Sequence, residues 1–111
     1  MEEIKVGEYI RTKKGYLGKY LKSAEGFDEF IDNEGTFGLD IEEVTKHSPN
    51  IIDLIEVGDY VNGEKVINID RVDSEYGIVK CSNGNHYWNY EIKTIVTKEQ
   101  FKAIEYKVEV D

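Results

Sequence analysis

The sequence predicts a mostly β protein built from two similar small units, and three observations support that fold class. Proline occurs once and tyrosine eight times among 111 residues. That composition, with frequent valine, isoleucine and threonine, favours strands over a helical bundle. The strand-like runs are short and are separated by glycine and asparagine. Finally, the stretch IKVGEYI at residues 4–10 returns as IEVGDYV at residues 55–61, 51 positions later.

The repeat extends beyond this opening stretch and includes the start of a helix. The triplet Val-Thr-Lys at residues 44–46 returns at residues 96–98, so the period is about 52 residues, as in duplicated supersecondary units. After the first triplet, Ser48 suits an N-cap and Pro49 suits the first helical position. After the second triplet, Gln100 lies three residues beyond the threonine, which is capping-box spacing. We therefore expect a short helical segment after each triplet.

The first unit contains alternating runs that predict three strands. Residues 8–12 alternate between apolar and polar types, and Gly15 marks a turn. Residues 16–21 resume an aromatic and aliphatic run, and residues 27–31 can form a third strand. The sequence Asn-Glu-Gly at residues 33–35 predicts the turn that follows.

The second unit has stronger turn signals. Asn62-Gly63 predicts a tight hairpin, and strand-like runs follow at residues 66–69 and 77–81. A second Asn-Gly pair at residues 83–84 predicts a hairpin that leads into residues 86–88. We therefore expect the second unit to repeat the strand plan of the first.

Together these elements predict two tandem SH3-like small barrels with short helical turns, at residues 1–54 and 55–111. Four or five short strands with one helical turn in about 50 residues is the plan of such a barrel. Strand-like triplets at residues 55–57 and 108–110 are expected to close the two units. The alternative is one mixed β-barrel with a helix, because units of about 50 residues are marginally stable alone.

Composition limits the classes of protein that the chain can represent. The formal net charge is −9, which opposes sequence-independent binding to phosphate backbones. A single cysteine allows no intramolecular disulfide and fits a reducing compartment. We find no apolar run typical of a signal peptide or of a membrane span. We therefore expect a cytoplasmic protein that does not bind membranes.

The charge is unevenly distributed, and the acidic segment predicts a protein-binding face. Residues 5–22 carry a net charge of +5, whereas residues 23–45 carry −8. Carboxylates along a strand edge can imitate a row of phosphates and bind a basic groove, with Phe27, Phe30 or Phe37 as anchors if they are exposed. The alternative is that the two segments neutralise each other. The candidate partner-binding residues are Glu25, Asp28, Glu29, Asp32, Glu34, Asp40, Glu42 and Glu43.

The basic segment predicts an alternative function in nucleic-acid binding. It interleaves lysines with Tyr16 and Tyr20, which can stack on bases while the cations contact phosphates. The stretch resembles the KOW-type hairpin of SH3-like barrels in ribosomal proteins and transcription elongation factors. The candidate residues for this function are Arg11, Lys13, Lys14, Tyr16 and Lys19.

Catalytic and metal-binding patterns are weak in this sequence. If Asn83-Gly84 forms a two-residue turn, Cys81 lies opposite His86, as in half of a metal site or a thiolate dyad. A zinc site needs four ligands, and the chain offers one cysteine and two histidines. Phosphate-binding glycine loops and metalloprotease or serine-hydrolase motifs are absent from the sequence. We therefore expect no enzyme activity, no cofactor and no metal.

Two stretches resemble small proteins encoded by temperate phages and prophages of Gram-positive bacteria. They are KHSPNIIDLIEVGDYVNGEKV at residues 46–66 and IVTKEQFKAIEYKV at residues 95–108. The resemblance implies a dispensable phage product in the host bacterial cytoplasm, where such proteins often inhibit CRISPR nucleases or other defence systems. We therefore expect an anti-CRISPR-like inhibitor of a host protein with a basic surface. The alternatives are the KOW-like nucleic-acid-binding module and a structural or assembly protein of the virion.

Overall fold

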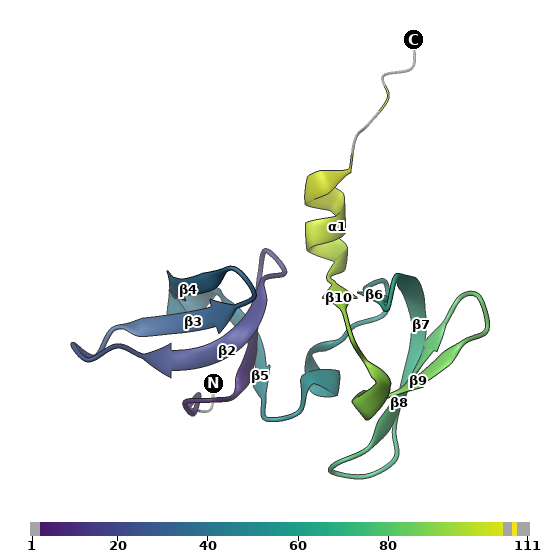
Figure 1. Ribbon diagram of the computed structural model, residues 1–111, viewed down its shortest axis with the longest axis horizontal. Coiled ribbons are helices and arrows are strands. Elements are labelled where there is room, and N and C mark those ends of the chain that lie inside the picture. Colours follow the sequence, from purple (N-terminus) through teal and green to yellow (C-terminus); the bar gives the residue numbers. More distant parts are fainter. Residues whose placement is uncertain (1–2, 106–107, 109–111) are drawn as a thin grey trace.

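The computed structural model describes residues 3–105 and residue 108, and it is mostly β, as predicted. The described chain forms two five-stranded antiparallel sheets that lie side by side (Figure 1). The first sheet has the strand order β4-β3-β2-β1-β5. Its strands are β1 (Tyr9–Thr12), β2 (Leu17–Lys22), β3 (Asp28–Asp32), β4 (Gly35–Gly38) and β5 (Val44–Ser48).

The second sheet repeats the topology of the first, strand for strand. Its order is β10-β6-β7-β8-β9, so β6 to β10 occupy the places of β1 to β5. Its strands are β6 (Tyr60–Val61), β7 (Glu64–Arg71), β8 (Gly77–Cys81), β9 (His86–Trp88) and β10 (Ile95–Val96). The short helices also correspond: η1 (Ile41–Glu43) to η3 (Asn89–Glu91), and η2 (Ile51–Leu54) to α1 (Lys98–Ile104).

The duplicated opening stretch forms the same turn in both units. Gly7 and Gly58 have φ angles of +93° and +100°, a region that favours glycine. In each copy the carboxylate after the glycine accepts a 2.7 Å hydrogen bond from the backbone N–H three residues earlier. Both copies therefore make the same tight bend, closed by a bond from a turn amide to the carboxylate. The second carboxylate, Asp59, is fully buried rather than solvated.

Each sheet packs on its own apolar core. The first core consists of Ile4, Ile10, Tyr20, Phe30 and Val44, and the second of Ile52, Ile55, Val61, Val66, Val79 and Cys81. Because Ile52 belongs to η2, which precedes the predicted boundary after residue 54, the end of the first unit packs in the core of the second. Neither sheet closes into a barrel: among the described residues no pairing joins the edge strands β4 and β5, or β9 and β10.

Three turn regions test the sequence predictions locally. Asn62 and Gly63 have φ angles of +52° and +82° between the paired strands β6 and β7, so the predicted tight hairpin is confirmed. Residues 55–57 form a loop and turn rather than a strand, because the duplicated glycine turn begins there. The matching triplet at residues 108–110 lies outside the described residues apart from Val108. Thr97 caps α1 by accepting a hydrogen bond from the Gln100 N–H, as its spacing predicted.

Candidate functional site

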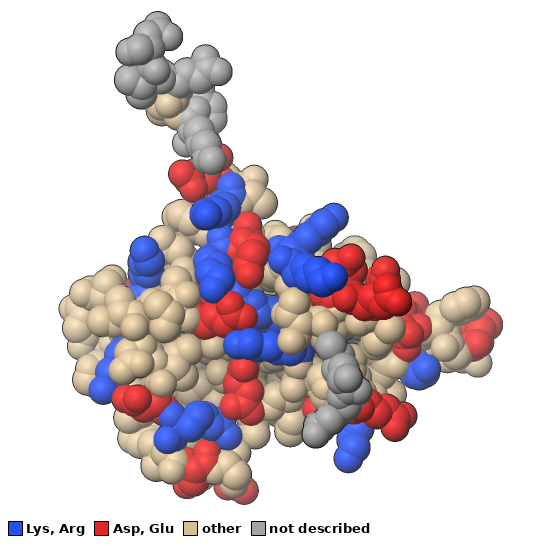
Figure 2. All heavy atoms as spheres, turned by 180° about the vertical axis from the view of Figure 1, so that it is seen from behind, with Lys and Arg blue, Asp and Glu red and all other residues tan. Residues whose placement is uncertain are grey.

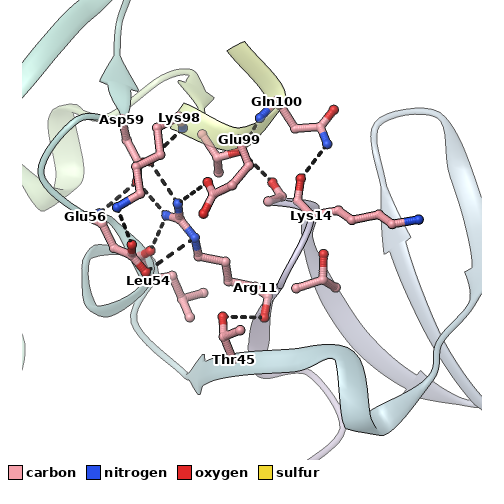
Figure 3. A network of polar contacts seen from close by, with 12 residues as sticks. Arg11, Lys14, Thr45, Leu54, Glu56, Asp59, Lys98, Glu99 and Gln100 are labelled. Carbon is pink, nitrogen blue, oxygen red and sulfur yellow. Dashed lines mark hydrogen bonds and ion pairs between the residues drawn. The ribbon is translucent and has the colours of Figure 1, made fainter. Parts of the chain in front are cut away.

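Arg11 lies between the two units and not on the surface. Its side chain is 1% exposed, and its guanidinium points from β1 toward the loop before β6 and the start of α1 (Figure 3). It donates to both oxygens of Asp59, at 2.5 and 2.9 Å, and to the backbone oxygen of Leu54 at 2.8 Å. A fourth bond reaches Glu99 at 2.7 Å. The structure therefore corrects the prediction that Arg11 binds nucleic acid, because buried carboxylates already occupy its donors.

Further polar contacts extend this junction. The hydroxyl of Thr97 donates to the backbone oxygen of Gly15 at 2.7 Å, and Gln100 donates to the backbone oxygen of Lys14 at 2.6 Å. Glu56 forms an ion pair with Lys98 at 2.8 Å (Figure 3). Partial burial acts to raise the pKa of Glu56, but Lys98, Arg11 and Lys46 together hold it below its ordinary value. Glu56 of the second unit thus links to the first unit through its ion pairs with Arg11 and Lys46.

The other residues of the basic hairpin differ in exposure and in surroundings. Lys13, Lys14 and Lys19 are exposed, and the Lys19 ammonium lies 5.2 Å from the centre of the Tyr9 ring. Tyr20 is only 3% exposed, so the prediction that it stacks on bases is wrong: its ring is part of the first core. Tyr16 is 45% exposed, but it faces a groove that is lined by carboxylates.

The eight predicted acidic residues are mostly not neutralised by the basic segment. Although β2 and β3 pair directly, a single ion pair links the two segments among the described residues, from Lys22 to Asp28 at 3.3 Å. Figure 2 shows acidic side chains on the side of the first sheet, with basic side chains among them. The excess negative charge of the first unit is therefore largely accessible.

Four of the eight line one groove on the first unit. Asp32, Glu34, Asp40 and Glu43 surround a hollow of about 560 Å³, with Lys14 as the one lysine or arginine in its described lining. Asp32 ends β3 and Glu34 lies in the tight turn that follows, where Asp32 pairs with Gly35, whereas Asp40 is the N-cap of η1 and Glu43 is its last residue. Opposing four carboxylates with one ammonium leaves a formal charge of −3 in the groove.

The lining of this acidic groove is partly aromatic. Phe30 and Phe37 are directly opposed across β3 and β4, with ring centres 5.7 Å apart. Phe30 is buried, whereas Phe37 is 41% exposed and lines the groove with Tyr16 and Leu39. The groove therefore combines negative charge with exposed apolar surface, the two features that favour a basic protein segment with an apolar side chain.

The remaining acidic residues lie outside this groove. Asp28 and Glu42 line a neighbouring hollow of about 600 Å³, where the Tyr20 hydroxyl donates to Asp28 at 2.5 Å. That hydrogen bond, followed by the one from Lys22, lowers the pKa of Asp28. Glu25 and Glu29 line neither hollow. Near them, Phe27 is 70% exposed on the β2–β3 turn.

The predicted dyad of Cys81 and His86 does not form. The turn between β8 and β9 takes three residues, because the Cys81 N–H bonds to the Asn85 oxygen, so His86 pairs with Lys80 instead. Cys81 is buried in the second core and His86 is exposed. Within residues 3–105 and 108 we find no cluster of three metal-ligating side chains. No helix in the described part of the chain is long and apolar enough to span a membrane.

Comparisons of the chain with protein-family models, with curated proteins and with solved structures found no match. The resemblances to phage proteins and to KOW-type hairpins therefore stay predictions. Among the described residues, the acidic groove brings four carboxylates together with the exposed rings of Tyr16 and Phe37.

Proposed function

We propose that the protein is a non-enzymatic binding protein whose acidic groove takes a basic segment of a protein partner. The observation that carries this proposal is the convergence of four carboxylates on a groove whose lining includes Phe37 and Tyr16. A lysine- or arginine-rich segment gains charge attraction from the carboxylates and apolar contact from the rings. In the host context implied by the phage resemblance, the partner is a defence or nucleic-acid-handling protein, and binding blocks its basic groove.

The same geometry disfavours nucleic acid as the ligand. Two of the five residues predicted for that role, Lys14 and Tyr16, line a groove in which carboxylates outnumber cations, and Arg11 is buried. The carboxylates would repel phosphates there, and phosphate binding depends on free cations.

The test is affinity capture from a nuclease-treated lysate of a CRISPR-bearing or phage-infected host, at low and moderate salt. The variant removes the groove charges by Asp32→Asn, Glu34→Gln, Asp40→Asn and Glu43→Gln. We expect a basic protein to be captured by the unaltered chain, released by moderate salt, and lost with the variant. The captured protein is then assayed for nuclease activity with and without the unaltered chain.

A matched control changes the net charge equally but outside the groove. Glu25→Gln, Glu29→Gln, Asp70→Asn and Glu105→Gln also remove four carboxylates, and all four positions lie outside the lining of the groove. Retained capture by this control assigns binding to the groove. Equal loss in both variants would instead show that only net charge matters, and capture of the chain's own copies alone would favour the virion-assembly alternative.

A further inference from the structure

Three aromatic side chains cluster at one end of the second sheet, distant in the sequence from the acidic groove; Tyr76 and Tyr90 are exposed and Trp88 is half-buried. Trp88 and Tyr90 are nearly parallel, with an interplanar angle of 15° and ring centres 6.1 Å apart. Tyr76 meets Tyr90 edge-on at 6.4 Å with an angle of 78°. Tyr76 is 44% and Tyr90 63% exposed, so ring faces are available to a ligand. We call these three residues the aromatic corner.

The backbone beneath the aromatic corner is held in place by side-chain hydrogen bonds. Asn89 donates to the backbone oxygen of Glu75 at 3.1 Å and accepts from the Gly77 N–H at 3.2 Å. It therefore ties the β7–β8 turn to η3. Within that turn, the Asp73 carboxylate accepts from the Tyr76 N–H at 2.8 Å. The rings are thus presented by fixed segments, which reduces the entropy lost on binding.

The charge around the aromatic corner is negative. Residues 70–91 contain four acids, Asp70, Asp73, Glu75 and Glu91, and two cations, Arg71 and Lys80. Both cations are already paired, Lys80 with Asp70 at 3.0 Å and Arg71 with Asp53 at 3.2 Å. Among the described residues, the one cation found over an aromatic ring is Lys19 on Tyr9, in the other unit. The aromatic corner therefore offers π faces and carboxylates without a cation stacked on its rings.

We propose that the aromatic corner binds an arginine side chain of a basic peptide segment, as a second recognition site independent of the acidic groove. A guanidinium is planar, stacks on aromatic faces and is attracted by the ring quadrupole. The rings of Tyr76 and Tyr90, at 78° to each other, present one face and one edge to the guanidinium. The nearby carboxylates complement its positive charge. A nucleobase can stack on the same rings, but its phosphates would meet these acids with no free cation.

The single tryptophan of the sequence makes this proposal directly measurable. Because the chain contains one Trp, the intrinsic tryptophan fluorescence reports on Trp88 alone. The full chain is titrated with a short acetylated peptide that alternates glycine and arginine. The matched probe replaces each arginine by citrulline, which keeps the shape and removes the charge. We expect a saturable change in emission with the arginine peptide, and at least about fivefold weaker binding of the citrulline peptide.

Variants separate this site from the acidic groove and from a loss of folding. Tyr90→Ala is expected to weaken the arginine peptide about fivefold, whereas Tyr90→Phe keeps the ring and the affinity. The groove variant described above is expected to leave the Trp88 response unchanged, even if capture of a partner is lost. An equal response to both peptides, a saturable response to a single-stranded oligonucleotide instead, or no response from a chain with an unaltered melting curve would overturn the proposal.

Discussion

The guanidinium of Arg11 in the first unit is bidentate with the carboxylate of Asp59 in the second, and the two side chains are 1% and 0% exposed. The pair is held by neighbours from both units, because Leu54 and Glu99 accept further bonds from the same guanidinium. Burial acts to lower the pKa of Arg11, but Asp59 and the adjacent glutamates raise it above its ordinary value. The charged form is therefore the form that joins the units.

Removing one partner of this pair should destabilise the whole chain. Arg11→Met keeps much of the volume but leaves Asp59 buried without its guanidinium, which costs about 3–5 kcal/mol. We expect a loss of that size in the free energy of unfolding measured by urea denaturation. The matched control is Lys22→Met, which breaks the exposed ion pair to Asp28 and should cost less than about 1 kcal/mol. Equal effects of the two variants would contradict a buried clamp.

Gly15 provides a second probe of the same junction. Its φ angle is +82°, and a Cβ there would lie 2.9 Å from the Cβ of Glu99 and closer still to Thr97. Gly26 has a similar φ of +88° but open space around it. We therefore expect Gly26→Ala to cost about 1–2 kcal/mol from backbone strain alone, and Gly15→Ala to cost about 1–3 kcal/mol more from overpacking.

The comparison of these two glycine variants isolates the contact between the units. Both substitutions impose the same left-handed strain, so their difference reports on the approach of α1 to the β1–β2 turn. Thermal melting followed by circular dichroism gives both values. Equal losses of stability in the two variants would mean that the start of α1 can move away from the β1–β2 turn without cost.

The sequence predicted the repeat well because its signals are local. Glycine turns, the Asn62-Gly63 hairpin and the Thr97 cap depend on neighbouring residues, and all of them form, whereas the hairpin at Asn83-Gly84 forms with a three-residue turn. The prediction for Arg11 was wrong for a different reason. Arg11 follows the buried Ile10 in a strand, so alternation assigns it to a solvent face, but the second unit covers that face. Its partner Asp59 lies 48 positions away, and no local pattern reports such a pairing.

The candidate site was predicted only in part, because it also depends on residues that are distant in the sequence. The acidic excess follows from composition, but the exposure of each phenylalanine does not: Phe27 and Phe37 are exposed, whereas Phe30 is buried. Which carboxylates share a groove depends on the β3–β4 hairpin and on the path of the chain into η1. That folding brings Asp32 near Glu43 but leaves Glu25 apart. The aromatic corner was not predicted, because its rings come from the β7–β8 turn, the end of β9 and η3, and Asn89 joins that turn to η3.

Cys81 should react slowly with thiol reagents in the folded protein. It is 2% exposed, and burial first, then the carboxylate of Glu64, raises the pKa of its thiol. The nucleophilic thiolate is therefore scarce and shielded. We expect modification by a chromogenic disulfide reagent to be slow at neutral pH and to become fast in denaturant. Rapid reaction in the folded state would contradict this burial and revive a reactive role for the thiol.

Acid should weaken the junction between the units, and the sign follows from Glu56. Its pKa in the folded protein lies below the ordinary value of 4.5, despite the opposing effect of burial, because Lys98, Arg11 and Lys46 stabilise the carboxylate. A lowered folded pKa contributes stability that is fully present above the unfolded pKa and is lost as the pH falls through the folded pKa. We therefore expect the free energy of unfolding to fall below about pH 4.5. Glu56→Gln should lower stability at neutral pH and flatten this acid dependence, whereas an unchanged slope in the variant would show that other carboxylates carry it.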